Sequence, residues 1–142
     1  MKLQKIIERL QRLHPKKIDL SLGRTFGLLK KLGNPQDKLK NVISVVGTNG
    51  KYSTIKSLQS ILNQGGYKCN IYLSPHLQSY TERYIYNDQE IQEQNLANLL
   101  EDIEKINGLE NITIFEALTC AYFKYCEKFK ENITIIEAGL FH

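Results

Sequence analysis

Long apolar runs are absent from this sequence. No segment approaches the length needed to cross a bilayer, and the N-terminal residues MKLQKIIERLQRLHP are interrupted by charges too often for the core of a signal peptide. Cysteine is scarce as well: Cys69, Cys120 and Cys126 are odd in number and lack the close pairing of a zinc site. We therefore expect free thiols that serve in packing, in a cytoplasmic protein without a membrane partner.

A strong charge of one sign is missing too. The 19 Lys and Arg residues and 15 Asp and Glu residues leave a net charge of +4, and the lysines are scattered without a basic stripe. This mild balance predicts no nucleic-acid partner and only a weak preference for small anions. At 142 residues, 42% hydrophobic and 24% charged, the chain suits one globular domain or a piece of a larger one.

Segments with a helical pattern alternate along the sequence with segments that have an extended pattern. Apolar residues recur at helical spacing in some segments, and shorter segments between them are rich in β-branched residues. The predicted helices cover residues 2–13, 22–32, 53–64, 96–106 and 113–129, and the predicted strands cover residues 41–46, 67–73 and 133–138. Residues 82–91 alternate around Asn87 and Asp88, which favours an irregular extended excursion or a small hairpin.

Strands that alternate with helices indicate an α/β fold. The segment 41–46 (NVISVV) is a nearly continuous β-branched run, which favours a strand covered on both faces in a parallel sheet. Three such strands are few for a complete sheet, so we expect an incomplete parallel sheet. An incomplete sheet exposes an apolar strand edge, and we therefore also expect poor solubility or association with another chain.

The first predicted strand leads into VVGTNGKYST, residues 45–54, which turns on two glycines before a predicted helix. Such a turn lets backbone N–H groups face an anion, and the helix N-terminus adds partial positive charge. The phosphate-loop pattern G-x-x-x-x-G-K-[ST] is not met, because Val45 occupies the first glycine position and Tyr52 follows Lys51. From these residues alone, a phosphate-binding loop and an ordinary turn with a solvated lysine both stay open.

Five motifs in a fixed order add to this segment. They are IDLSLGR at 18–24, LGNP at 32–35, GTNGK with Ser53 and Thr54, YLSPHL with ERYIYN at 72–87, and TIFEALT with IIEAGL at 113–140. In these motifs the sequence resembles the folylpolyglutamate synthase and dihydrofolate synthase family of the Mur ligase superfamily. The resemblance covers almost the whole chain but only about the first third of a typical member. It implies an incomplete P-loop-type parallel sheet with helices on both faces. It also implies that residues 1–142 are the N-terminal portion of the Mur-ligase-type ATP-binding domain, without the rest of that domain and without the C-terminal glutamate ligase domain.

The resemblance also implies a role for each matched residue. Lys51 would be catalytic, stabilising charge on the transferring γ-phosphoryl group of ATP. Ser74 and Glu137 would supply the hard oxygen ligands that Mg²⁺ requires. The residues implied to bind ATP are Thr48, Asn49, Gly50, Lys51, Ser53 and Thr54, and those implied to contact the pteridine-bearing substrate are Lys17, Ile18, Asp19, Leu20, Thr113, Ile114, Phe115 and Glu116.

The reaction implied by the resemblance is an ATP-dependent ligation in two steps. A carboxylate of dihydropteroate or of a folate is phosphorylated to an acyl phosphate, and the amino group of L-glutamate then displaces phosphate to form an amide. A carboxylate must approach a triphosphate in the first step, so Mg²⁺ and a lysine are needed to neutralise the charge. By the same resemblance, full-length relatives are expected to be monomers, and this short chain is expected to be inactive alone.

Several of these residues also have a purely structural explanation. The spacing of Thr113 and Glu116 is that of a helix capping box, which accounts for Glu116 without a substrate. Ser74 precedes a proline and could shape a turn, and Asp19 could be a surface residue near a helix start. Tyr52 replaces the glycine usual in the family, and its ring is expected to crowd the backbone that approaches phosphate.

Other functions also stay open at this point. Tyr80, Tyr84 and Tyr86 could stack on a base or a pterin, but tyrosines at alternating spacing are more typical of strand packing. A non-catalytic nucleotide-binding relic would keep the phosphate loop and not the reaction, and an unrelated P-loop ATPase would hydrolyse ATP without ligation. Formation of an amide-linked product from ATP, Mg²⁺ and glutamate distinguishes the ligase from both.

Overall fold

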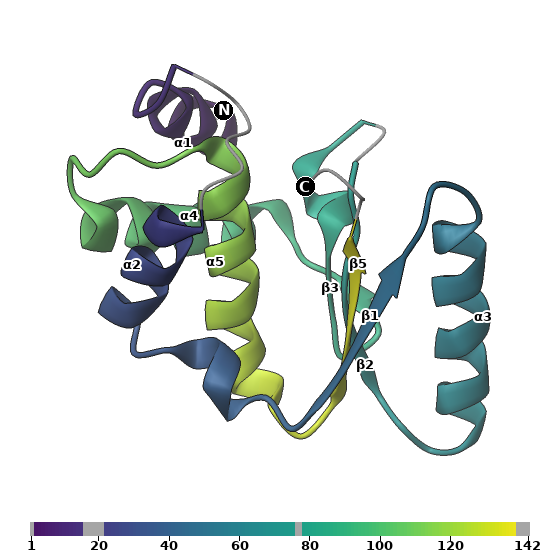
Figure 1. The fold of residues 1–142 in the computed structure, drawn as a ribbon. Helices are drawn as coiled ribbons and strands as arrows, with labels where there is room; N and C mark the ends of the chain where they lie inside the picture. The colour runs from purple at the N-terminus through teal and green to yellow at the C-terminus, as the bar shows by residue number, and fades with distance from the viewer. Residues whose placement is uncertain (1, 16–21, 76–77, 139–142) are drawn as a thin grey trace. The chain divides into compact units, whose positions relative to one another are not determined.

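Figure 1 shows the computed structural model, which describes residues 2–15, 22–75 and 78–138. The chain divides into two compact units, each formed by two separate stretches of sequence. Unit 1 contains Met1–Asp37 and Gln92–Tyr125, and unit 2 contains Lys38–Ile91 and Cys126–His142. None of the helices in the described ranges combines the length and the hydropathy that a bilayer crossing requires.

Unit 1 is built from helices. They are α1 (Lys2–Gln11), α2 (Gly23–Lys31), α4 (Glu93–Asn107) and α5 (Ile114–Cys126), with the short 3₁₀ helix η1 (Pro35–Lys38) after α2. α1 and α2 both pack against α4. The apolar residues of α1 recur at helical spacing and are all buried, so one side of this helix belongs to the core. On its exposed side, Arg9 donates two hydrogen bonds of 2.8 Å to the Glu104 carboxylate of α4.

Unit 2 is a five-stranded sheet with α3 (Lys51–Gln64) packed on it (Figure 1). The strands are β1 (Asn41–Val46), β2 (Cys69–Tyr72), β3 (Tyr84–Tyr86), β4 (Gln89–Glu90) and β5 (Ile133–Ala138), and the 3₁₀ helices η2 (Tyr80–Arg83) and η3 (Glu127–Phe129) precede β3 and β5. The order in the sheet is β1-β5-β2-β3-β4. β5 pairs in parallel with both β1 and β2, while β3 and β4 add an antiparallel hairpin beside β2. The core of this unit is formed by Ile55, Cys69, Ile71, Leu73, Ile85 and Ile135.

The α/β class and the mostly parallel sheet are confirmed. The strands at 41–46 and 133–138 have the predicted bounds, and each predicted helix is present with ends that differ by a few residues. The hairpin around Asn87 and Asp88 is confirmed as well. These two residues have φ angles of 54° and 66° and join β3 to β4, which fits the tolerance of Asn and Asp for the left-handed region.

The prediction that the strand at 41–46 is covered on both faces is wrong. β1 lies at the edge of the sheet, and Val42 and Val46 are 47% and 65% exposed. Ile43 and Val45 pack against the core instead, because successive side chains of a strand point to opposite faces. β1 is therefore a half-exposed edge strand, and its continuous apolar run does not indicate that both of its faces are buried.

The aromatic residues of the hairpin region pack against one another. The ring centroids of Tyr72 and Tyr84 are 5.6 Å apart, those of Tyr84 and Tyr86 are 6.3 Å apart, and those of Tyr86 and Phe129 are 6.1 Å apart. All three tyrosines are buried. The structural explanation of Tyr84 and Tyr86 as strand packing is thus supported. Cys69, Cys120 and Cys126 are buried and form no disulfide, as predicted.

Candidate functional site

The turn between β1 and α3 is shaped by two glycines. Gly47 has a φ angle of 148° and Gly50 one of 75°, a region that residues with a side chain rarely adopt. α3 begins at the next residue, Lys51, and Gly50 offers no side-chain cap for the first N–H groups of the helix. These N–H groups and the positive end of the helix dipole are therefore left for an external anion.

Tyr52 does not crowd this turn, contrary to the expectation from the sequence. Its side chain is exposed, and the Nζ atom of Lys56 lies 5.5 Å from the centroid of its ring. Residues four apart lie on the same face of a helix, so the ring extends along α3. The space where a Cβ of Gly50 would lie has no neighbouring atom within 4 Å. The other residues implied to bind ATP, Thr48, Asn49, Ser53 and Thr54, are exposed at the turn and in the first turn of α3.

The strand register brings distant residues to the edge of the sheet beside this turn. β1, β5 and β2 run parallel, so their carboxyl ends meet at one edge, where α/β proteins bind ligands. Glu137 of β5 lies opposite Val45 of β1, and Ile136 lies opposite Tyr72 of β2. Ser74 follows two residues after Tyr72, and its backbone N–H donates a hydrogen bond to the Glu137 carboxylate. Two residues predicted to bind Mg²⁺ are therefore neighbours.

Glu137 is a buried carboxylate that faces a lysine. Its side chain is 8% exposed, that of Lys51 is 19% exposed, and Nζ of Lys51 lies 4.0 Å from Oε1 of Glu137. Burial raises the pKa of Glu137, while the charge of Lys51, the N–H of Ser74 and the charge of Arg83 act to lower it. The predicted phosphate lysine and a predicted Mg²⁺ ligand thus lie side by side at a helix N-terminus.

Known proteins are similar to this chain in sequence and in fold, although no protein-family model matches it. The dihydrofolate synthase/folylpolyglutamate synthase of Escherichia coli is 37% identical over 131 residues, which are 92% of this chain and 31% of that protein. E. coli FolC in complex with DHPP and ADP matches with a TM-score of 0.88 at 36% identity, over 97% of this chain and 33% of that one. The chain belongs to the dihydrofolate synthase/folylpolyglutamate synthase family.

A second solved member of the family supports the same assignment. The bifunctional folylpolyglutamate synthase/dihydrofolate synthase of Yersinia pestis, complexed with AMPPNP and Mn ion, matches with a TM-score of 0.86 at 32% identity, over 97% of this chain and 33% of that one. This chain therefore spans about a third of the length of the relatives that it matches.

The oxygen atoms at the sheet edge suit the magnesium ion that this family resemblance implies. Ser74 and Glu137 offer one hydroxyl and one carboxylate, both hard ligands. In the described part of the chain, no three Asp, Glu, His or Cys side chains gather as a metal-binding group. Mg²⁺ is commonly bound by one or two protein oxygens, with water and phosphate completing its shell, so the small set of ligands fits this ion.

Arg83 was missed by sequence reasoning. It is 3% exposed, and its Nη1 atom donates a hydrogen bond of 3.3 Å to Oγ of Ser74. The signal that could have identified it is its place in ERYIYN, because an arginine beside a buried apolar strand is costly unless it has a partner. One of its partners is Ser74, a residue of the candidate site.

The predicted substrate segment at 113–116 begins α5 in unit 1. The Thr113 N–H donates to Oε2 of Glu116 and the Glu116 N–H donates to Oγ1 of Thr113, both at 3.2 Å, which is the predicted capping box. Arg24 donates to both oxygens of the same carboxylate, at 2.8 and 3.1 Å. The structural explanation of Glu116 therefore has direct support, and its contact with substrate stays a prediction. Thr113 and Ile114 are buried and Phe115 is partly exposed; Lys17, Ile18, Asp19 and Leu20 lie outside the described residues.

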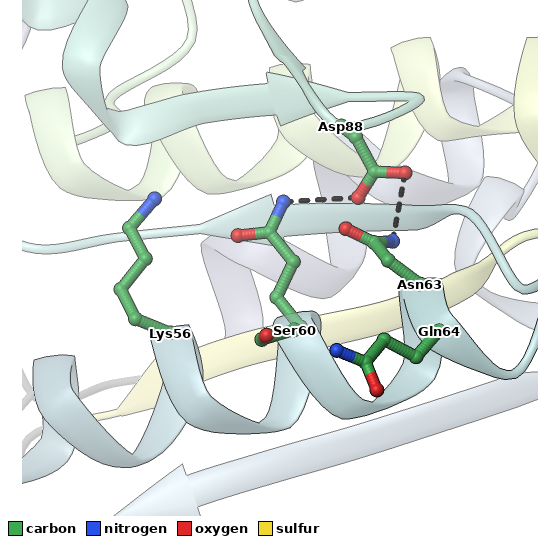
Figure 2. Close-up of a pocket in the computed structure, with 6 residues that line it drawn as sticks. Lys56, Ser60, Asn63, Gln64 and Asp88 are labelled. Atoms are coloured by element: carbon green, nitrogen blue, oxygen red, sulfur yellow. Dashed lines mark hydrogen bonds between the residues drawn. The ribbon is translucent and has the colours of Figure 1, made fainter.

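A polar surface pocket of about 570 Å³ lies along α3, beside Asp88 (Figure 2). It is lined by Lys56, Gln59, Ser60, Asn63, Gln64 and Asp88. The Asp88 carboxylate accepts hydrogen bonds from the side chains of Gln59 at 2.9 Å and Asn63 at 3.0 Å, and from the backbone N–H of Cys69 at 3.3 Å. These bonds attach the β3–β4 turn to α3 and to β2. The pocket contains none of the predicted site residues.

Proposed function

We propose that this chain forms the phosphate- and magnesium-binding part of an ATP-dependent ligase that adds L-glutamate to dihydropteroate or to a folate. In this proposal residues 1–142 are the N-terminal portion of a Mur-ligase-type ATP-binding domain. The observation that supports it most directly is the 4.0 Å separation of Lys51 and Glu137 at the N-terminus of α3. Relatives of the same fold are described in complex with ADP, or with AMPPNP and Mn ion.

Each residue of the site has a task in this reaction. The backbone N–H groups of the turn at 47–51 would hold the phosphates of ATP, with the hydroxyls of Ser53 and Thr54 nearby. Lys51 would turn its ammonium group from Glu137 to the γ-phosphoryl group and stabilise the charge that develops there. Ser74 and Glu137 would hold Mg²⁺, which when bound neutralises the repulsion between the triphosphate and the substrate carboxylate.

The binding step can be tested with AMPPNP, which has a γ-phosphoryl group, and Mn²⁺ in isothermal titration calorimetry. Lys51→Met should weaken binding by about 10- to 100-fold, the range expected for loss of a charge-assisted hydrogen bond. Lys56→Met is the matched control, because Lys56 lies on the same helix but contacts the Tyr52 ring rather than the site. A wild-type chain that fails to bind, or equal losses in the two variants, would contradict the proposal.

The ligase assignment needs a separate test, because the chain spans about a third of its relatives. We expect the chain alone to bind nucleotide without forming an amide from ATP, dihydropteroate and glutamate. A chimera in which this chain replaces the matching third of the E. coli relative should form that product. ATP consumption without glutamate incorporation would favour ATP hydrolysis instead of ligation, and a chimera that binds nucleotide but forms no product would favour a non-catalytic nucleotide-binding role.

We also propose that the isolated chain self-associates through β1. The strand is at the sheet edge and exposes Val42 and Val46, and such apolar edges tend to pair with other strands. Replacing both valines with lysine should lower the mass measured by light scattering. A wild-type chain that is already a monodisperse monomer would contradict this expectation.

A cytoplasmic location is proposed on the state of the cysteines. All three are buried thiols without a disulfide, as is usual in a reducing compartment. Fractionation of cells that express a tagged chain would test the location, and recovery of the chain outside the cytoplasmic fraction would contradict it.

A further inference from the structure

Arg83 is held in place by contacts on several sides. It ends η2 directly before β3, and its backbone carbonyl accepts a hydrogen bond of 3.0 Å from the N–H of Leu73. Its guanidinium carbon lies 5.6 Å from the ring centroid of Tyr80, within the range of a cation–π contact. Because the residue that follows Leu73 is Ser74, the backbone bond alone brings Arg83 next to a predicted Mg²⁺ ligand.

The side chain of Arg83 turns toward that ligand. Nη1 donates to Oγ of Ser74 at 3.3 Å, and the charge of Arg83 is close enough to favour the ionised form of Glu137. The Ser74 backbone N–H in turn donates to the Glu137 carboxylate. Arg83 therefore contacts one of the two oxygen ligands and acts electrostatically on the other.

A hydroxyl is a weak metal ligand whose oxygen must be aimed at the ion. The hydrogen bond from Arg83 occupies one lone pair of the Ser74 oxygen and leaves the other available, because a hydroxyl oxygen has two acceptor positions. A guanidinium presents its N–H donors in a fixed planar fork, which gives this hydrogen bond a defined direction. Hydrogen-bond partners of this kind orient metal ligands in many proteins.

We propose that Arg83 is a positioning residue for the candidate magnesium centre, and that it fixes the Ser74 hydroxyl oxygen beside the Glu137 carboxylate. This inference rests on the proposed function, since it assumes that Ser74 and Glu137 hold a metal ion. Arg83 acts through Ser74 and contacts neither nucleotide nor substrate in this role.

The test measures the affinity of the full chain for Mn²⁺ in the presence of ADP, by electron paramagnetic resonance of free Mn²⁺. Arg83→Gln should weaken Mn²⁺ binding by about 10- to 100-fold, the usual effect of removing such a partner. Arg83→Lys keeps the charge and the stem and should recover part of the loss. Arg24→Gln is the matched control, because Arg24 also pairs with a buried side chain but in unit 1, and it should leave Mn²⁺ affinity unchanged.

Ser74→Ala completes a double-mutant cycle that isolates the proposed contact. If Arg83 acts through Ser74, changing Arg83 in the Ser74→Ala background should cost less than 3-fold in affinity, about 0.6 kcal/mol by the relation of free energy to affinity. Equal losses in both backgrounds would overturn the inference, as would an Arg83→Gln chain that folds and binds Mn²⁺ like the wild type. Where Arg83→Gln does not fold, the same cycle is run with Arg83→Lys. Failure of the wild-type chain to bind Mn²⁺ with ADP would instead overturn the proposed function.

Discussion

For Glu116, a structural role and a substrate-binding role predict opposite effects of its replacement on the free energy of unfolding. Its side chain is 9% exposed, and that of its partner Arg24 is 22% exposed. Glu116→Ala removes the reciprocal cap at the start of α5, worth about 1 kcal/mol, and leaves Arg24 partly buried without its carboxylate, worth about 1–3 kcal/mol. We therefore expect the free energy of unfolding to fall by about 2–4 kcal/mol.

Urea unfolding followed by far-UV circular dichroism measures this change, and dichroism suits a chain that contains no tryptophan. Glu116→Gln should cost less than Glu116→Ala, because an amide oxygen can still accept from the Thr113 N–H. Arg24→Ala and the double variant complete a cycle, for which we expect a coupling energy of about 1–2 kcal/mol. A loss below about 0.5 kcal/mol for Glu116→Ala, or no coupling to Arg24, would refute the structural role and leave substrate binding as the reason for this carboxylate.

Three further predictions follow from the same structure. Tyr52→Gly should change the ADP affinity measured by calorimetry by no more than about 2-fold, because the ring lies along α3. It should lower the free energy of unfolding measured in urea by about 0.5–1 kcal/mol, because glycine has a low helix propensity. A clear gain in ADP affinity would show that the ring blocks the turn. Burial raises the pKa of Cys120 to about 12 and that of Cys69 to about 11, so both thiols should react with iodoacetamide only after unfolding, and rapid labelling of the native chain in a mass spectrum would disprove this burial. Burial also raises the pKa of Glu137 above its ordinary value of 4.5. The stability that its protonated form provides is therefore present below pH 4.5 and is lost as the pH rises through the raised pKa. Glu137→Gln should flatten this part of the curve of stability against pH in thermal melts run across acidic pH, and an unchanged curve would show that another group titrates there.

The sequence predicted the bounds of β1 and β5 well and the exposure of β1 poorly, for a shared physical reason. A β-branched run specifies an extended chain through local preferences, so the bounds of β1 and β5 could be predicted. Whether a neighbour covers each face depends on the position of the strand in the sheet, which no local pattern reports. β1 therefore resembled a buried strand while lying at the edge with Val42 and Val46 exposed.

The candidate site shows the same division between local and distant information. The glycine turn before Lys51 is visible in the sequence because φ angles in the left-handed region require glycine or a few polar residues. The contact between Arg83 and Ser74 depends on the chain folding back through η2 to pair β3 with β2, so it could not be located from spacing alone. The proximity of Ser74 and Glu137 was implied only by family resemblance, and the parallel register explains it.

The central position of β5 has a consequence for how the chain is made. β1 and β2 are synthesised early, but within the described residues each of them finds its parallel partner in β5, which follows both of them in the sequence. A nascent chain that has not yet delivered Ile133–Ala138 therefore holds two apolar strands with the gap between them unfilled, a state that favours aggregation or capture by a chaperone. Lys51 leaves the ribosome long before Glu137, the carboxylate with which it pairs. Until β5 inserts, unit 2 therefore has neither a continuous parallel sheet nor the ion pair between Lys51 and Glu137.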